Sequence, residues 1–558
     1  MIKNSIPKGL SNFVASVKKV LRKAPQKNVS LWDSLVGKQP ADWRNSAVPN
    51  TASRVLIATS MGGYQQGALL ESVLAVALTL RGAKVEILLC DEFLPACQLT
   101  KIGGNPVEQF LSSPKQARCG KCFAYGNDLF SPLGLPVHRF SSFVTHEQSL
   151  EVKKIAAEIS LDDIDNYEWN GLAIGEHAKA GALRYYASGN LSSEPHAEPV
   201  LRRYLESALL TAMVTSNLLE QNTYDVVCFN HGIYVPQGIV GEVCRRNQTA
   251  VVNWNPSYRK STFIFSHGDS YHHTMITEPV ESWENIELTE AVEKKTMDYL
   301  KSRWYGTEDW IWFHEKPESG LEKIASEIGV DFSRPVVGLL TNVMWDAQLH
   351  YRSNAFKDML DWIIQTIHYF EKRPDLQLLI RVHPAEVRGV VPSRQPIVAE
   401  IKKIFPQLPP NVFVIPPESQ VSTYAAMQEC DTVLIYNTKT GIEISSQGIP
   451  VVVAGEAWIR NKGISLDATS PQGYFQILDQ LPLKKRMDEV SLVRARKYAY
   501  HFFFRRMIQL PFFKEQLEVS IQNVEELLPG RLKGLDVICE GILNGTPFIY
   551  PDELEVQP

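Results

Sequence analysis

The sequence lacks several features that would each assign it to a particular class of protein. No run of about 18 apolar residues occurs, so no transmembrane helix is expected. The N-terminus has no apolar signal-peptide core. Neither sign of charge dominates, and the net charge of −5 gives no reason to expect nucleic-acid binding. No solenoid repeat and no low-complexity tract is present, so a folded cytoplasmic protein is the expectation.

Cysteine is also scarce, and eight residues in 558 indicate a reducing cytoplasm rather than a disulfide scaffold. Four of them lie close together in the sequence, at Cys90, Cys97, Cys119 and Cys122. The two-residue gap in the second pair suits a structural zinc site, and suits an iron–sulfur cluster less well. Four ordinary cysteines without metal are the alternative. A redox pair is a more distant one, because a thioredoxin-like context is absent.

The length and composition predict a multidomain α/β protein. A chain of 558 residues is too long to fold around a single hydrophobic core. Its content of 44% apolar and 21% charged residues is typical of globular domains. We expect a second domain to begin near Pro335. The predicted parts are an N-terminal segment and linker (1–49), a first α/β domain (50–333, with a cysteine-containing insertion at 91–150), a second α/β domain (334–480) and a C-terminal helical segment (481–558).

The N-terminal segment is basic. Residues 1–27 carry seven Lys or Arg and no acid, and apolar residues from Leu10 to Leu21 fall on one helical face. A basic amphipathic helix of this kind can lie on an anionic membrane, which predicts peripheral association with the inner membrane face. A solvated or docked terminal helix is the alternative.

Two strand–helix–strand units are predicted in the first domain, at residues 54–90 and 225–254. In the first unit, Gly62 and Gly63 leave backbone room for a ligand, and a tight turn without ligand is the alternative. The second unit leads into residues 255–273, which are dense in side chains that hold phosphates and sugars; half of them could equally pack in the core. The candidates there are Tyr258, Arg259, Lys260, His267, Asp269 and His272.

Residues 377–455 predict the parallel sheet of the second domain. Four short apolar runs, at 378–382, 412–415, 433–436 and 450–454, alternate with helix-like segments. Polar residues gather where each strand ends. Because ligands of open α/β sheets bind beyond the carboxyl ends of the strands, these loops predict one site. Farther on, residues 488–529 predict helix around an aromatic-rich centre.

Two α/β domains that face each other are the general architecture of GT-B glycosyltransferases. The motifs Arg381-Val-His-Pro-Ala-Glu386, Ser422-Thr-Tyr and Asn437-Thr-Lys-Thr-Gly-Ile-Glu443 resemble the capsule polysaccharide biosynthesis glycosyltransferases. These are relatives of the bacterial Kdo and sialic acid transferases. The resemblance covers most of residues 50–510 and implies a GT-B-like fold with two Rossmann-like domains.

The resemblance also implies a nucleotide-sugar site in the second domain. The His-Pro pair resembles the family's nucleotide-contacting pair, and the Thr-Gly-Ile-Glu turn resembles its phosphate- and ribose-binding turn. Glu443 would then bind ribose hydroxyls, or would support the first helical turn electrostatically. The predicted donor-binding residues are Arg381, His383, Pro384, Ser422, Thr438, Lys439, Thr440, Gly441 and Glu443.

An inverting transfer needs a general base for the acceptor hydroxyl. His231 and Asp269 are the candidates, because both follow apolar strands in the first domain. No Asp-x-Asp pair that could hold a metal–diphosphate lies near the donor motifs, so no catalytic metal is expected. The remaining candidates for the acceptor or phosphate side are Gly62, Gly63, Tyr258, Arg259, Lys260, His267 and His272.

The predicted function is transfer of a sugar from a nucleotide sugar to a glycan or lipid-linked acceptor in surface or capsular polysaccharide biosynthesis. A sugar-nucleotide epimerase of the same fold is one alternative. A non-catalytic scaffold in a glycan-assembly complex is another.

The cysteine pattern generates a direct test. If the four cysteines at 90, 97, 119 and 122 bind zinc, purified protein should carry about one zinc per chain by elemental analysis. Replacing Cys119 and Cys122 by Ser should remove it, whereas Cys430→Ser should not. Protein that contains neither zinc nor iron after careful preparation would contradict the site.

Overall fold

The computed structural model describes residues 30–36, 43, 53–303, 308–310, 320–347, 349, 353–389, 391–483, 486–515 and 518–551. The predicted basic helix in residues 1–27 lies outside this part of the chain. Within the described residues, no helix is both long and apolar enough to cross a membrane. A short helix, α2 (Ser30–Leu35), anchors to the first domain through Trp32, whose Nε1 donates to Ser72 Oγ at 2.9 Å.

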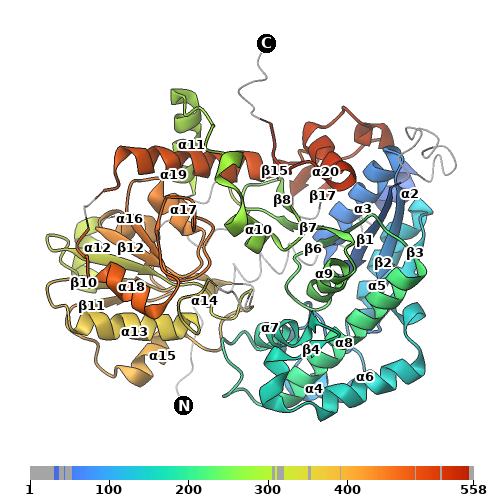
Figure 1. Cartoon of the computed structure of the whole chain (residues 1–558), viewed down its shortest axis with the longest axis horizontal. Helices are drawn as coiled ribbons and strands as arrows, with labels where there is room; N and C mark the ends of the chain where they lie inside the picture. Colours follow the sequence, from blue (N-terminus) through green and yellow to red (C-terminus); the bar gives the residue numbers. More distant parts are fainter. Residues whose placement is uncertain are drawn as a thin grey trace, which may run out of the picture.

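The first domain is built on a seven-stranded sheet with the order β15-β8-β7-β6-β1-β2-β3 (Figure 1). Five neighbouring strands run parallel to one another: β7, β6, β1, β2 and β3. Strand β8 pairs antiparallel with β7, and β15 pairs antiparallel with β8. The strand bounds are β1 (Arg54–Ser60), β2 (Lys84–Leu89), β3 (Val137–Arg139), β6 (Val226–Asn230), β7 (Ala250–Pro256), β8 (Thr262–His267) and β15 (Ile508–Gln509).

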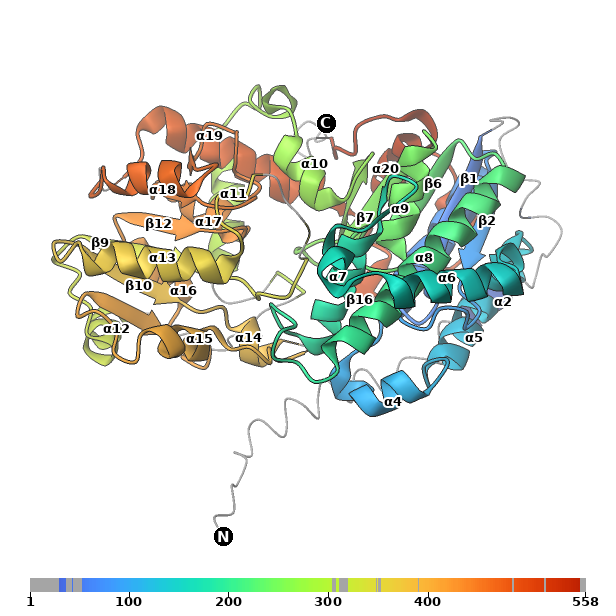
Figure 2. The same cartoon turned by 60° about the horizontal axis from the view of Figure 1, so that its bottom comes forward.

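Alternate residues of β1 face two different hydrophobic cores. Val55 and Ile57 pack with α3 (Gln65–Leu80), whereas Leu56 and Ala58 pack on the side of α8 (Ala197–Gln221). The period-2 alternation of side chains along a strand puts an apolar residue on each face. Helices α7 (Ile174–Tyr186) and α9 (Gln237–Arg246) join α8 on its side of the sheet (Figure 2).

The second domain has a six-stranded parallel sheet with the order β11-β10-β9-β12-β13-β14. In sequence terms this is 3-2-1-4-5-6, the order of a doubly wound Rossmann-like sheet. The predicted strands are confirmed to within two residues at each end. Their bounds are β9 (Val336–Leu340), β10 (Gln377–Arg381), β11 (Val412–Ile415), β12 (Thr432–Ile435), β13 (Val451–Val453) and β14 (Leu466–Asp467).

Helices cover both faces of the second sheet (Figures 1 and 2). Leu379 of β10 packs in one core and its neighbours Leu378 and Ile380 in the other. The helices of this domain are α12 (Leu321–Ile328), α13 (Met359–Glu371), α14 (Ala385–Arg388), α15 (Ile397–Ile404), α16 (Thr423–Gln428), α17 (Thr440–Ser445) and α18 (Pro471–Leu478). Two Rossmann-like domains therefore form a GT-B-like fold, as predicted.

The C-terminal part of the chain crosses from the second domain back to the first. Helix α19 (Glu489–Tyr500) packs on α17 and on α11 (Glu290–Ser302), and continues as a π-helix over His501–Arg506. Strand β15 then pairs with the edge strand β8, and α20 (Lys533–Asn544) packs on α3. The crossing ties both domains together (Figure 1).

The helix predicted over 488–529 is therefore wrong beyond residue 506. Three short strands follow instead: β15, β16 (Phe513–Glu515) and β17 (Glu518–Val519). Ile508 pairs with Phe263, so the edge of the first sheet captures this segment in an extended form. A partner strand that lies 245 positions earlier in the chain leaves no local signal in the sequence.

Candidate active site

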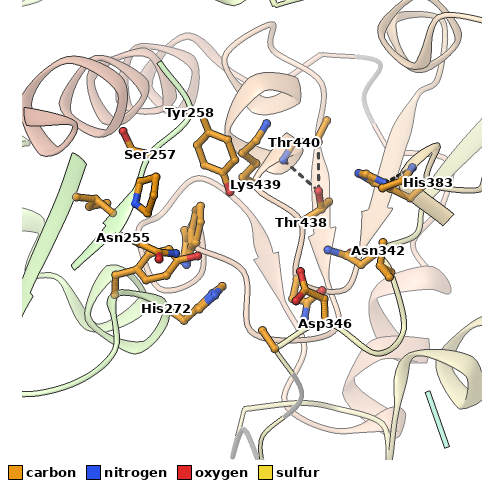
Figure 3. Close-up of a pocket in the computed structure, with 18 of the residues that line it drawn as sticks. Asn255, Ser257, Tyr258, His272, Asn342, Asp346, His383, Thr438, Lys439 and Thr440 are labelled. Carbon is orange, nitrogen blue, oxygen red and sulfur yellow. Dashed lines mark hydrogen bonds between the residues drawn. The ribbon is translucent and has the colours of Figure 1, made fainter. Parts of the chain in front are cut away.

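A cavity of about 760 Å³ lies between the two domains, at the carboxyl ends of both sheets. The loops after β9, β10 and β12 form one wall, and those after β6 and β7 form the other. Strands β9 and β12 are neighbours whose connections run in opposite directions, which is where open α/β sheets bind ligands. Figure 3 shows Thr438, Lys439 and His383 facing Asn255 and His272 across this space.

Seven of the predicted donor-binding residues meet on the second-domain wall. Besides Arg381 and His383, they include the residues at positions 384, 422, 438, 439 and 440, while Gly441 lies behind the wall. The Ala385 backbone N–H donates to His383 Nδ1 at 3.1 Å, so the remaining ring nitrogen, Nε2, carries the proton. The hydroxyls of Thr438 and Thr440 lie 3.2 Å apart. This wall therefore presents several neutral hydrogen-bonding groups.

Glu443 does not line the cavity, and its carboxylate has partners within the protein. It accepts hydrogen bonds from Lys439 Nζ at 2.8 Å and from the Tyr424 hydroxyl at 2.5 Å, and it pairs with Arg303 Nε at 3.1 Å. Burial alone would raise the pKa of Glu443, but Arg303 and Lys439 hold it at about 2. The predicted ribose contact therefore lacks a free carboxylate, and Glu443 instead holds two cations that line the cavity, Lys439 and Arg303.

Arg303 joins this network to a second carboxylate, that of Asp309, with which it forms an ion pair. The Tyr299 hydroxyl donates to Asp309 at 2.7 Å, and Lys439 Nζ lies 4.5 Å from the ring centroid of Tyr258. Two cations and two carboxylates thus balance one another within the described residues. Sequence reasoning missed Arg303 and Asp309 because they come from the chain between the two domains.

Arg381 is buried and acts on a neighbouring loop. Its guanidinium donates to the carbonyl of Pro416 at 2.6 Å and to Thr423 Oγ1 at 3.2 Å. Burial lowers the pKa of Arg381 to about 10. These bonds hold the segment between β11 and α16 in place.

His231 follows β6 and lies half-buried on the first-domain wall. Its φ of +68° is in the left-handed region, and Gly232 continues the turn at +81°. Backbone strain at a non-glycine residue is common where a side chain serves function. Nδ1 of His231 has no hydrogen-bond partner among the described residues. Burial, followed by Arg184 and His272, lowers its pKa to about 3, so the imidazole is neutral.

Several aromatic rings line the same cavity as His231. The ring centroid of His272 lies 4.2 Å from that of Tyr271 and 5.7 Å from that of Trp458 in the second domain, with the rings tilted to one another. Burial lowers the pKa of His272 to about 4, so this ring is neutral as well. Tyr258 also lines the cavity, as the sequence indicated.

Several other predicted residues lie away from the cavity. Asp269, the second candidate base, accepts a hydrogen bond from His273 Nδ1 at 2.8 Å and lies 3.6 Å from Arg245. Lys260 is exposed at the surface. Arg259 donates to the Phe503 carbonyl, and His267 stacks on Phe548. Aromatic packing and a local ion pair, rather than a ligand, therefore account for these residues.

The loop that contains Gly62 and Gly63 packs against a neighbouring helix. A Cβ on Gly62 would lie 2.5 Å from the backbone oxygen of Cys122, and one on Gly63 would lie 3.0 Å from the Cys122 sulfur. The glycines thus let β1 approach α5 (Cys119–Phe130), and neither lines the cavity. This outcome matches the alternative of a turn without ligand.

The four candidate zinc ligands lie around this contact as free thiols. The Gly63 N–H donates to Cys122 Sγ at 3.0 Å, and burial raises the pKa of the Cys122 thiol to about 11. Across the described chain, no group of three or more His, Cys, Asp or Glu side chains is arranged to hold a metal ion. As placed here the thiols do not fit zinc, and the zinc site stays a prediction for elemental analysis.

The buried ion network generates a stability prediction. Glu443→Gln should lower the free energy of unfolding by about 3–5 kcal/mol, because it leaves two buried cations with one carboxylate. Urea denaturation measures this loss. Glu158→Gln is the control, since Glu158 and Lys154 form an exposed pair worth about 0–1 kcal/mol. Equal losses in the two variants would contradict the network's role.

Part of the second domain matches a known protein family. Residues 331–487, which contain the second-domain wall, match the family model described as "Capsule polysaccharide biosynthesis protein". A comparison with curated proteins found no match.

Similar solved structures include two from Thermosulfurimonas dismutans. The KpsC β-Kdo 2,4 transferase is 13% identical, covers 49% of this chain and 79% of its own, and has a TM-score of 0.32. The KpsC β-Kdo 2,7 transferase is 11% identical, covers 56% of this chain and 88% of its own, and has a TM-score of 0.31. The UDP-GlcNAc 2-epimerase from Neisseria meningitidis bound to UDP-GlcNAc is 10% identical, covers 81% of this chain and 98% of its own, and has a TM-score of 0.23.

The match to the family model is confined to residues 331–487, and the chain's own two Rossmann-like sheets give it a GT-B-like fold.

Proposed function

We propose that this protein is a glycosyltransferase of capsular or surface polysaccharide biosynthesis, which moves a sugar from a nucleotide sugar to a glycan or lipid-linked acceptor. The observation that carries the proposal is the cavity itself. The loops of the domain that contains the family match face a strained, half-buried and neutral His231 from the other domain. Donor and acceptor would meet between these two walls.

The donor would bind to the second-domain wall. His383 Nε2–H and the Thr438 and Thr440 hydroxyls supply hydrogen bonds to phosphate oxygens, and Asn342 adds an amide beside them (Figure 3). Lys439 supplies charge that Glu443 partly neutralises. Hydrogen-bond donors placed where charge develops stabilise a departing phosphate in the transition state.

His231 would act as the general base. The acceptor oxygen attacks the anomeric carbon while its hydroxyl proton moves to Nδ1 of His231. The bond from the anomeric carbon to the phosphate oxygen breaks, and its electron pair leaves with the nucleotide. Negative phosphates in the cavity would favour the protonated imidazole, so donor binding should raise the pKa of His231 toward working pH.

An epimerase of the same fold would act without an acceptor, and a scaffold would bind nucleotide without turnover. Nucleotide release that requires an added acceptor favours the transferase over both.

The donor site can be tested by binding alone. His383→Ala should weaken nucleotide-sugar affinity by about tenfold, because it removes a hydrogen bond to a charged group. A thermal-shift screen against CMP, UDP, GDP and dTDP sugars finds the ligand, and calorimetry then measures its affinity. His368→Ala is the control, since that histidine is exposed on α13. Unchanged affinity in His383→Ala would place the nucleotide elsewhere.

The base assignment predicts a loss in turnover. His231→Asn should lower kcat by about 100-fold or more with little change in donor affinity, and Asn tolerates the left-handed backbone at this position. Asp269→Asn should retain turnover, because Asp269 lies outside the cavity. Near-normal turnover of His231→Asn at saturating acceptor would exclude His231 as the base.

The pH dependence gives an independent check on His231. Its free-enzyme pKa of about 3 means that the base is already unprotonated at pH 5. The kcat/KM of the wild type should therefore stay level from pH 8 down to pH 5, whereas an ordinary histidine base would lose activity below about pH 6.5. An acid limb near pH 6.5 that His231→Asn removes would contradict the lowered pKa.

A further inference from the structure

We propose that Lys101 and Arg184 form an anion subsite on the first-domain wall, which binds a carboxylate or phosphate group of the acceptor. The inference rests on the proposed function and extends it to the chemical class of the acceptor. Both side chains line the same cavity as His231, and neither belongs to the motifs recognised in the sequence.

The two cations are held in place by the first domain. Arg184 projects from α7, and its guanidinium carbon lies 4.6 Å from the ring centroid of Tyr234. Lys101 ends a loop that is tied down by the Gln98 N–H, which donates to the Val235 carbonyl at 2.8 Å. Lys101 and Arg184 line the same cavity. Burial lowers the pKa of Lys101, and repulsion by the positive charges of Arg184 and Arg118 lowers it further. An anion between them would relieve that repulsion.

The charges on the two walls are not balanced in the same way. On the second-domain side, Lys439 and Arg303 are both paired, through Glu443 and Asp309. On the first-domain side, Lys101 has no carboxylate partner in the part of the chain that the structure describes.

Among the residues that the structure describes, the carboxylate that pairs with Arg184 is shared and comes from the other domain. Asp346 lies 3.6 Å from Arg184 and already accepts a hydrogen bond from the Tyr234 hydroxyl at 2.8 Å. Glu456 also lines the cavity, but it lies 3.9 Å from His273 and accepts a hydrogen bond from the Ser353 N–H. His231 and His272 are neutral. Lys101 and Arg184 together therefore carry more charge than Asp346 neutralises.

The position of this excess charge points to the acceptor. The subsite lies beside the proposed base His231, on the wall opposite the loop from Thr438 to Thr440 that would hold the donor phosphates. A charged hydrogen bond to a carboxylate or phosphate would orient the acceptor so that its hydroxyl reaches Nδ1 of His231. A donor phosphate is the other possible source of the anion, and the experiment separates the two.

The test measures binding of simple probes to the full-length protein. Ligand-observed NMR compares glucuronate and glucose 6-phosphate with neutral glucose. The wild type should bind at least one anionic probe more tightly than glucose. Lys101→Gln should weaken that binding by about tenfold or more, because it removes a charge-assisted hydrogen bond, and Lys101→Arg should retain most of it. Lys115→Gln is the matched control, since Lys115 is an exposed lysine of the same domain.

Two outcomes would overturn the proposal. One is a failure to discriminate. The wild type would bind charged and neutral probes equally, or Lys101→Gln and Lys115→Gln would bind the anionic probes equally. The other is a loss in Lys101→Gln that appears with UDP, GDP or CMP and not with the sugar acids, which would assign the anion to the donor. Probe binding that depends on Lys101 in a protein without transferase activity would refute the proposed function and leave the subsite standing.

Discussion

The site depends on a buried network of four charges. Glu443 at the start of α17 holds Lys439 and Arg303, and Asp309 holds Arg303 from the other side. These residues come from the second domain and from the chain that connects the domains, so their pairing fixes the donor loop relative to the connection. Removing one member would leave a buried charge without a partner, which costs several times more than losing an exposed ion pair.

The same network gives the cavity an uneven distribution of charge. Because the cations of the second-domain wall, Lys439 and Arg303, are paired with carboxylates, that wall offers mainly hydroxyl, amide and imidazole groups. The first-domain wall instead combines two neutral histidines with Lys101 and Arg184. Hydrogen-bond recognition on one side and charge recognition on the other would let two substrates bind in defined orientations. In the proposed mechanism, His231 on the first-domain wall would take the proton of the acceptor.

The C-terminal crossing makes this arrangement possible. Helix α19 packs on the second domain, its π-helical continuation carries buried aromatic residues, and β15 then joins the edge of the first sheet. π-Helical turns are rare and are frequent at functional sites. Here the turn lies where the chain leaves one domain for the other, and Phe502 reaches from it to the cavity wall.

The sequence by itself determined the parallel sheet of the second domain, the strand–helix–strand units of the first and the loop from Thr438 to Thr440. Short Val- and Ile-rich runs separated by helices have a strong local pattern, and the carboxyl ends of parallel strands must share one edge, so His383 and Thr438 were predictable as neighbours. His231 was predictable for the same reason. Tertiary structure alone decided which polar residues are free to bind a ligand. Glu443, Arg381 and Asp269 read as ligand-binding residues until their protein partners are seen, and those partners lie in other segments. Lys101, Arg184 and Arg303 carry no motif, because their importance comes from the charges that the fold places, or does not place, beside them.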